Sequence, residues 1–323
     1  MILIVGGAGY IGSHVNLLLN QRGYETVIFD NLCSGHKEAV VSGHFLYGDL
    51  NDREALERVM TEYDISIVMH FGAFAYVGES VIHPEKYYYN NVVNTLNLLS
   101  AMRKCNVKKI IFSSTCAVYG DAVTIPIPES APKNPINPYG KTKLMIESIL
   151  QDYCKAYGME YVCLRYFNAA GADSSAVIGE SHEPETHIIP KIFDAVCGRS
   201  DKFVVYGDDY ETPDGTCVRD YLHVSDIAEA HLCAAQHLFE TGESNVFNLS
   251  NKKGYSVLDI IHVVEKVVGK ELNYSVSGRR EGDPSILVGD STLIRSKLGW
   301  NPKHEEIEEI IRNAWNWYCN KKY

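Results

Sequence analysis

A tyrosine and a lysine stand four residues apart in Tyr139-Gly-Lys-Thr-Lys143, at the start of a predicted helix over residues 139–157. Residues four apart on a helix share one face, so the phenol and the ammonium should be neighbours. A free phenol is a poor base because its ordinary pKa is near 10. A nearby positive charge stabilises the phenolate and lowers that pKa, which would let Tyr139 act as a general base.

A run of hydroxyl residues supplies the second part of this predicted catalytic set. Ser113, Ser114 and Thr115 follow an apolar run that predicts a strand over Lys109–Phe112. Reacting groups collect at the carboxyl ends of parallel strands. We therefore predict that Thr115 shares a hydrogen bond with the substrate hydroxyl that Tyr139 deprotonates. A Tyr-x-x-x-Lys pattern alone also occurs on solvated helix faces, so this prediction depends on the glycine motif that precedes it.

Three glycines at three-residue spacing follow the first apolar run of the chain. Ile2–Val5 predicts a buried strand, Gly6, Gly9 and Gly12 come next, and a helical pattern follows. This order places backbone N–H groups and the positive end of the helix dipole against a pyrophosphate. A second apolar run ends at Asp30, roughly 20 residues later, where an adenosine ribose needs an acceptor. The pattern predicts a dinucleotide site, and the acid favours NAD because it would repel the 2′-phosphate of NADP.

Strand and helix patterns alternate through the first half of the chain, which predicts an α/β fold with a Rossmann-type doubly wound parallel sheet. The predicted strands are Ile2–Val5, Thr26–Phe29, His44–Tyr47, Ile67–His70, Lys109–Phe112 and Tyr161–Arg165. Helices are predicted over 51–63, 90–105 and 139–157, and the Pro-rich stretch 121–138 is an expected loop. The alternation stops after Asn168. We therefore expect an NAD-binding domain over 1–168 and a smaller C-terminal substrate lobe over 169–323, interleaved with the first.

Composition excludes several classes of protein. A net charge of −11 over 323 residues argues against nucleic-acid and membrane-surface binding, which call for a basic face. The sequence contains no signal-peptide pattern and no apolar run of membrane-spanning length. Nine cysteines without a Cys-x-x-Cys pair predict neither a disulfide framework nor a metal site, and they favour a reducing cytoplasm.

Together these motifs resemble the extended short-chain dehydrogenase/reductase superfamily, and most closely its UDP-galactose (UDP-glucose) 4-epimerase family. The likeness runs from the first strand to beyond Trp300. The matching blocks, in the family's order, are Gly6–His14, Asp30–Leu32, Gly48–Leu50, His70–Phe71, Val77–Ser80, Ser113–Thr115, Val118–Gly120, Tyr139–Lys143, Leu164–Asn168, Gly207–Tyr210, Asp214–Thr216, Val218–His223 and Arg279–Asp283.

The resemblance implies an NAD-dependent isomerase that oxidises C4 of a UDP-sugar transiently and returns the hydride to the other face. Its implied catalytic residues are Tyr139, Lys143 and Thr115. The implied NAD contacts are Gly6, Gly9, Tyr10, Ile11, Gly12, Asp30, Asn31, Asp49, Leu50, Phe71, Asn90, Lys143 and Tyr166. The implied UDP-sugar contacts are Thr115, Tyr139, Asn168, His187, Tyr206, Arg219, Arg280, Asp283 and Leu287. Phe167, next to Tyr166, is equally compatible with an ordinary core position, whereas for Tyr206 and Leu287 the core position is the less favoured alternative. A homodimer through the helices 90–105 and 139–157 is also implied.

The chain departs from the family's pattern at a few positions. Ala75 stands where relatives can carry a lysine that contacts the cofactor, and His187 stands where relatives can use asparagine near the substrate. Leu287 stands where a tyrosine limits the sugar pocket to plain hexoses, while smaller residues are associated with N-acetylhexosamines. We therefore expect UDP-N-acetylglucosamine and UDP-N-acetylgalactosamine to react alongside UDP-glucose and UDP-galactose.

Three other functions fit parts of the pattern. A sugar-nucleotide 4,6-dehydratase would need an Asp-Glu pair before Val-Tyr-Gly, where this chain has Cys116-Ala117. A non-catalytic NAD sensor would not need a base. A net NAD-dependent sugar-nucleotide oxidoreductase stays open as the alternative, because the phenol–lysine pair suits both reactions and only the fate of the cofactor separates them.

Overall fold

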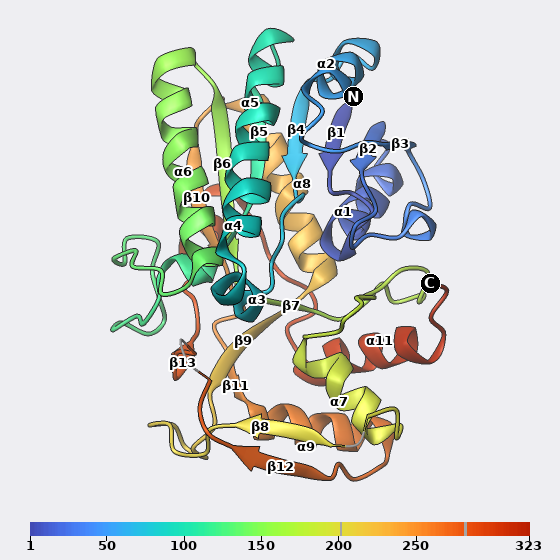
Figure 1. Ribbon diagram of the computed structural model, residues 1–323, viewed down its shortest axis with the longest axis vertical. Coiled ribbons are helices and arrows are strands. Elements are labelled where there is room, and N and C mark those ends of the chain that lie inside the picture. Colours follow the sequence, from blue (N-terminus) through green and yellow to red (C-terminus); the bar gives the residue numbers. More distant parts are fainter. Residues whose placement is uncertain (201, 281–282) are drawn as a thin grey trace.

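A seven-stranded parallel sheet forms the body of the computed structural model, which describes residues 1–200, 202–280 and 283–323 (Figure 1). The strand order is β10-β6-β5-β4-β1-β2-β3. This sheet confirms the predicted doubly wound α/β class. Its strands are β1 (Ile2–Val5), β2 (Thr26–Asp30), β3 (His44–Tyr47), β4 (Ile67–His70), β5 (Lys109–Thr115), β6 (Glu160–Tyr166) and β10 (Asn245–Leu249).

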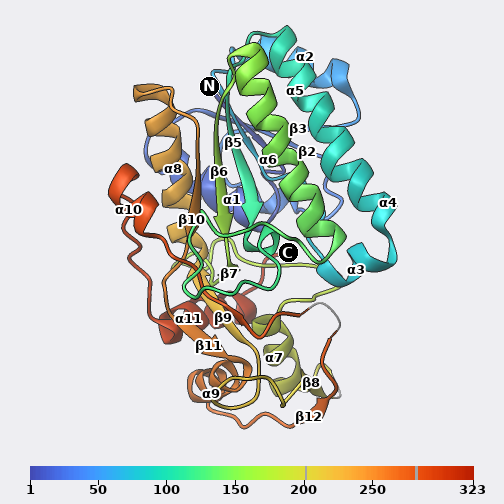
Figure 2. The same ribbon diagram turned by 90° about the vertical axis from the view of Figure 1, so that its left-hand side faces the viewer.

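Helices cover both faces of the sheet, as the edge-on view in Figure 2 shows. Alternate residues of each strand point to opposite faces, so Ile2 and Ile4 belong to one core and Leu3 and Val5 to the other. The first core packs on α1 (Tyr10–Gln21) and α8 (Val224–Glu240). The second packs on α2 (Arg53–Glu62), α5 (Asn94–Lys104) and α6 (Pro138–Tyr157).

Capping residues place the ends of the predicted helices. The side chain of Asp52 accepts a hydrogen bond from Ala55 N at 2.9 Å at the start of α2. Asn137 does the same for Gly140 N at 2.8 Å, and Pro138 occupies the first turn of α6. Gly158 ends α6 in the left-handed region with φ +65°. These local signals explain why the patterns in the sequence located both helices.

The predicted helix over 90–105 is wrong in its first turn. The short helices α3 (Val77–Ile82) and α4 (Pro84–Tyr87) lead into a π-helical turn, η2 (Tyr88–Val93), before α5 begins. Asn91 in this wide turn exchanges hydrogen bonds with both backbone groups of Phe74, at 2.9 and 3.1 Å. Its amide also donates to Thr142 Oγ1 at 3.1 Å. The π-turn thus ties the segment after β4 to α6, which a period of 3.6 residues could not reveal.

The second half of the chain builds a smaller lobe at the carboxyl end of the sheet (Figure 1). Its central strand β9 pairs with β7 and β13 in parallel and with β11 in antiparallel fashion, while β8 and β12 form a separate parallel pair. The helices α7, α9 and α11 supply a third core. The elements of this lobe are β7 (Asn168–Ala170), α7 (Ile188–Val196), β8 (Phe203–Tyr206), β9 (Val218–His223), β11 (Gly254–Ser256), α9 (Val257–Val268), β12 (Tyr274–Ser277), β13 (Ile286–Leu287) and α11 (Ile307–Cys319).

Three elements of the second half belong to the body of the molecule, one of them α10 (Thr292–Leu298), whose Ile294 is part of the first core. The strand β10 extends the large sheet beside β6, and α8 packs against α1. The chain therefore passes between the body and the smaller lobe more than once. A domain boundary at residue 168 stays a prediction.

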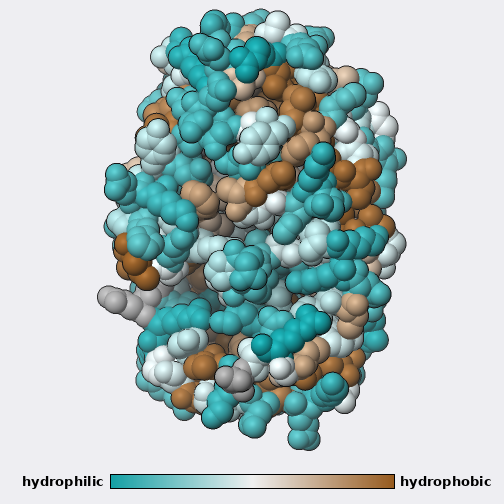
Figure 3. Space-filling view, turned by 45° about the vertical axis from the view of Figure 1, so that its right-hand side comes forward, coloured by the Kyte–Doolittle hydropathy of each residue, from teal (hydrophilic) through white to brown (hydrophobic). Residues whose placement is uncertain are grey.

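Most of the face in Figure 3 is hydrophilic, and its apolar side chains form small separate groups. None of the helices in the described residues has both the length and the apolar composition needed to cross a membrane. All nine cysteines lie in the described part of the chain, and each is a free thiol.

Candidate active site

The parallel strands bring the predicted NAD and catalytic residues to one edge of the sheet. Because all seven strands run in the same direction, their carboxyl ends meet there. At or just after these ends lie the Gly6–Gly12 turn, Asp30, Asn31, Asp49, Leu50, Phe71, Thr115 and Tyr166.

The glycine turn between β1 and α1 has no space for side chains at its ends. Gly6 has φ +75°, and a Cβ there would lie 2.5 Å from Gly72 N. A Cβ on Gly12 would lie 2.4 Å from Gly6 O. No side chain of the described residues caps the start of α1, and its first turn, Tyr10–Ser13, carries no acid. The turn therefore offers free N–H groups at a helix N-terminus, which fits a dinucleotide pyrophosphate.

Asp30 is fixed beside this turn. Its two carboxylate oxygens accept hydrogen bonds from Ala8 N at 2.9 Å and Leu32 N at 2.8 Å. Burial raises the pKa of the carboxyl group, while the two N–H donors oppose that rise. Asn31 donates to Asp49 Oδ2 at 2.6 Å, so the residues after β2 and β3 are held together. These acceptors suit the hydroxyls of an adenosine ribose.

The predicted catalytic residues come together from β5 and the first two turns of α6. The Thr115 hydroxyl lies close enough to the Tyr139 phenol to lower its pKa, and the Lys143 ammonium lies 5.9 Å from the centre of the Tyr139 ring. Lys143 Nζ donates to Ser113 O at 2.7 Å. The main-chain acceptor of Ser113 was not among the predicted contacts, because a carbonyl gives no signal in a sequence.

Burial controls the proton affinities of this pair. It raises the pKa of Tyr139 to about 12, against the effect of Thr115, and lowers the pKa of Lys143 to about 7. The expected lowering of the phenol pKa by Lys143 is therefore not present in the chain alone. The ammonium is directed to a carbonyl oxygen, and desolvation of the phenolate dominates. A further positive charge beside the phenol would lower this pKa toward neutrality.

The remaining predicted cofactor residues line the same region. Phe71 and Tyr166 both pack against His231 of α8, with ring centres 4.8 and 6.1 Å away. The Tyr166 hydroxyl is hydrogen-bonded to Ser113 Oγ. Asn90 lies on the π-turn and donates to Asn91 Oδ1 at 3.0 Å.

The predicted substrate residues gather around β9 in the smaller lobe. Arg219 forms an ion pair with Asp283, and the Arg280 guanidinium lies 4.1 Å from the centre of the Tyr206 ring. Leu287 on β13 is the register partner of Arg219 and packs on the first core. A guanidinium group pairs well with phosphate oxygens, so Arg219 and Arg280 each suit a diphosphate. Glu281 and Gly282, inside the matched Arg279–Asp283 block, lie outside the described residues.

Asn168 and His187 complete the predicted set. Asn168, at the start of β7, donates from Nδ2 to Asp220 O of β9 at 3.2 Å, and this bond ties the two strands together. His187 precedes α7, and its ring centre lies 6.2 Å from that of Tyr76. It also belongs to a cluster with Glu180, His182 and Glu185, none of which was a predicted site residue.

Comparisons with known proteins agree with this geometry. Residues 2–250 match the NAD dependent epimerase/dehydratase family. A UDP-glucose 4-epimerase from Halalkalibacterium halodurans is 48% identical over 98% of this chain and 95% of its own length. The crystal structure of UDP-glucose 4-epimerase from Brucella ovis in complex with NAD has 48% identity and a TM-score of 0.95, over 98% of both chains. That of the Bifidobacterium longum enzyme in complex with NAD⁺ and UDP has 37% identity and a TM-score of 0.94, over 99% of this chain and 98% of that one.

Proposed function

The chain belongs to the NAD dependent epimerase/dehydratase family, and from this premise we propose that it interconverts UDP-glucose and UDP-galactose. The observation that carries the proposal is the Thr115–Tyr139–Lys143 set beside a glycine turn that fits a dinucleotide. The chain is an NAD-dependent isomerase in this account, since its homologues are UDP-glucose 4-epimerases.

Each residue of the set has a chemical task. Tyr139 takes the proton from the sugar 4-hydroxyl and later returns it, with Thr115 holding the hydroxyl in place. NAD, when bound, supplies the hydride acceptor and donor for C4, and its positive ring supplies the charge that Tyr139 lacks in the chain alone. Lys143 would hold the nicotinamide ribose. Arg219 and Arg280 bind the diphosphate, so the sugar can turn while its anchor stays fixed.

The residues before Val118 do not support the dehydratase alternative. Cys116 is buried, and burial raises the pKa of its thiol to about 12. Ala117 carries no titratable group. Neither residue can donate and accept protons near neutral pH as the acid–base pair of a dehydratase must.

The net oxidoreductase alternative differs in what happens to NAD. A reaction that returns its own hydride needs no exchange of cofactor, so the purified protein should contain nucleotide and convert UDP-galactose to UDP-glucose without added NAD. The measurement is product formation by chromatography, together with absorbance at the NADH band. Activity that rises in proportion to added NAD, with accumulating NADH, would favour the oxidoreductase.

We propose further that the chain acts as a homodimer in the cytoplasm. Exposed apolar side chains on η2 and α6 support a dimer, among them Tyr89, Val93, Met145 and Tyr157. The two elements pack against one another, so these side chains share one side of the molecule. Nine free thiols support a reducing compartment.

A further inference from the structure

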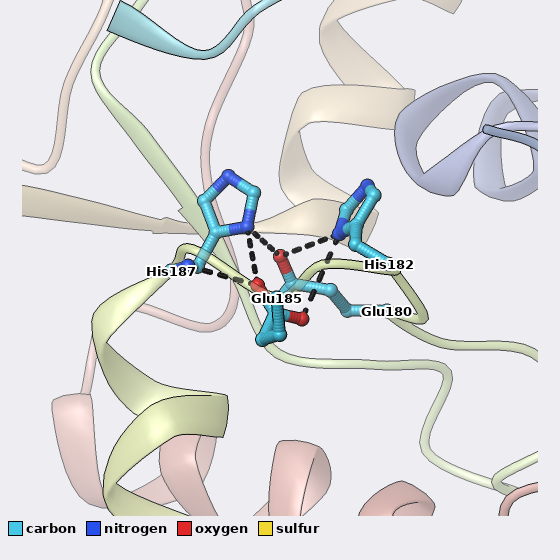
Figure 4. Close-up of side chains that lie close together, drawn as sticks. All are labelled: Glu180, His182, Glu185 and His187. Carbon is cyan, nitrogen blue, oxygen red and sulfur yellow. Dashed lines mark hydrogen bonds and ion pairs between the residues drawn. The ribbon is translucent and has the colours of Figure 1, made fainter. Parts of the chain in front are cut away.

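Two histidines and two glutamates converge in the loop between β7 and α7 (Figure 4). The Nδ1 atoms of His182 and His187 point into the cluster, and their Nε2 atoms point away from it. One ligand atom from each of Glu180, His182, Glu185 and His187 lies within 4.8 Å of the other three. This is the one such group among the described residues.

The distances within the cluster are close to those of a tetrahedral metal site. His187 Nδ1 lies 2.8 Å from Glu180 Oε1 and 2.9 Å from Glu185 Oε1. His182 Nδ1 lies 3.5 Å from Glu180 Oε1 and 3.7 Å from Glu185 Oε2. Zinc bonds of 2.0–2.2 Å in tetrahedral geometry separate neighbouring ligand atoms by about 3.3–3.6 Å. The four groups would need only small movements to surround one ion.

Three of the ligand atoms lack a hydrogen-bond partner. They are Glu180 Oε1, His182 Nδ1 and Glu185 Oε2, all fully buried and without a partner in the described part of the chain. His187 Nδ1 lies 2.8 Å from Glu180 Oε1 as an ion-pair contact, and the same Nδ1 atom is bonded to Glu185 Oε1 at 2.9 Å. The Glu180 side chain is 9% exposed. Buried polar atoms are normally hydrogen-bonded, and these three atoms have only ion-pair contacts within the cluster, so the cluster can accept a further partner.

The rest of the fold holds the ligand-bearing loop in place. Trp317 Nε1 donates to Glu180 O at 2.8 Å, and Ser181 Oγ donates to Tyr323 O at 3.2 Å. Glu185 Oε1 accepts from Thr186 N and His187 N at 2.7 and 2.8 Å, which leaves Oε2 for another partner. The cluster is therefore built before any ion arrives.

Charge and ligand type select the class of ion. Two carboxylates in a largely buried site are balanced either by two protonated imidazoles or by one divalent cation. Imidazole nitrogen with carboxylate oxygen suits zinc and neighbouring transition metals, whereas calcium and magnesium prefer sites built of oxygen alone. We propose that Glu180, His182, Glu185 and His187 bind one zinc-like divalent ion, at a site that shares His187 with the predicted substrate contacts and contains none of Thr115, Tyr139 and Lys143.

This site would stiffen the boundary between the cofactor turn and the smaller lobe. The Tyr10 ring, in the first turn of α1, meets the His182 ring edge-on at 6.4 Å. Tyr76 meets both histidine rings at 6.2 Å. An ion held by the loop would thus fix the partners of Tyr10 and Tyr76.

Zinc binding to the full chain tests the proposal without any assay of activity. Chelator-treated protein is titrated with Zn²⁺ against a chromophoric chelator, alongside His182→Ala and Glu185→Gln. The unmodified chain should bind one equivalent, and each variant should bind at least about 10-fold more weakly, as loss of a metal-site group usually causes. The matched controls are His262→Ala and Glu62→Gln, which change exposed residues of α9 and α2 and should bind zinc as the parent does.

Two further measurements keep the test independent of folding defects. Zinc should raise the thermal midpoint of the parent and the controls by a few degrees but leave both variants unchanged. Cobalt(II) in the unmodified chain should give the intense visible absorption of a tetrahedral site. The proposal is overturned if the parent binds no zinc, if His182→Ala and Glu185→Gln bind zinc as well as the parent does, or if cobalt stays octahedral. Absence of epimerase activity would leave these readouts unaffected.

Discussion

Burial acts in opposite directions on the two titratable groups of the catalytic pair. It raises the pKa of Tyr139 to about 12 and lowers that of Lys143 to about 7, so in the chain alone burial disfavours the charged form of both side chains. A phenolate at Tyr139 then depends on a positive charge brought by the bound cofactor. This dependence would restrict base catalysis to the cofactor-loaded state.

Replacing the phenol tests the assignment of Tyr139. Tyr139→Phe removes the proton acceptor and should lower turnover roughly 100- to 10,000-fold, the usual contribution of a positioned acid–base group. Binding of UDP, measured by calorimetry, should be largely retained because Arg219 and Arg280 are intact. Tyr87→Phe serves as a control, since Tyr87 is a buried phenol bonded to Tyr76 and Glu79 outside the catalytic set. Near-normal turnover of Tyr139→Phe would contradict the assignment.

Leu287 is the residue from which we predict the breadth of sugar specificity. It lies on β13 next to Arg219 and is half-buried, so it can reach a sugar attached to the anchored diphosphate. Its side chain is smaller than tyrosine and offers an apolar wall to an acetyl methyl group. Leu287→Tyr should therefore suppress the reaction of UDP-N-acetylglucosamine and largely spare that of UDP-glucose, because added bulk rejects the larger ligand. Rates with both sugars check this. Equal loss of both, or no N-acetyl reaction in the parent, would refute it.

At the scale of elements, α6 is held against the sheet by a buried ion pair. Arg165 on β6 donates to both carboxylate oxygens of Glu147 at 2.9 and 2.5 Å, and Ser114 on β5 adds a bond at 2.5 Å. Arg165 and Glu147 are each 2% exposed. Glu147 lies one turn after Lys143, so this network fixes the helix that carries the catalytic ammonium.

Neutralising Glu147 should therefore reduce both stability and turnover. Glu147→Gln leaves the buried Arg165 guanidinium without a charged partner, which typically costs about 3–5 kcal/mol. Denaturant unfolding measures this loss. The same chemical change at the exposed Glu62 should have little effect, since no buried charge depends on it. Equal unfolding midpoints for the two variants would show that the pair contributes nothing to stability.

The elements that the sequence located are those whose signals are local. Apolar runs such as Ile2–Val5 marked the strands, and caps such as Asp52 and Asn137 marked the helix starts. The π-turn at Tyr88–Val93 escaped because its cause, the bonding of Asn91 to Phe74, is a tertiary contact. The place of β10 beside β6 escaped for the same reason, since its partner lies some eighty residues earlier in the chain.

At the scale of the whole molecule, the residues of the candidate site also fall into those that local sequence patterns predicted and those that they did not. Residues in motifs with fixed spacing, such as Tyr139 and Lys143, could be predicted to meet. The cluster around His187 was missed, and the absence of Cys-x-x-Cys pairs led us to expect no metal site. A usable signal was present in the spacing Glu-x-His-x-x-Glu-x-His over residues 180–187. This short spacing indicates a possible metal site only when the loop is known to bring the four side chains together.

The assembly of the molecule yields the last prediction. An apolar side of η2 and α6 that stays exposed in one chain is a natural interface for a second copy, related by a two-fold axis. Val93 is 41% exposed and Met145 is 44% exposed on this side. Placing a charge there should cost binding between the copies, because an unpaired carboxylate would be buried in the interface. Val93→Asp and Met145→Asp should therefore shift the mass measured by light scattering from dimer toward monomer.

A matched control separates the interface from a general effect of added charge. Val123 lies in the loop before α6 and is fully exposed, at 100%, so Val123→Asp makes the same change away from the proposed interface. It should leave the mass unchanged. Thermal unfolding of each variant shows whether the chain is still folded when it dissociates. If the parent is monomeric at micromolar concentration, there is no such dimer. If Val93→Asp and Met145→Asp stay dimeric, the interface lies elsewhere, because a two-fold contact would bury each added charge twice.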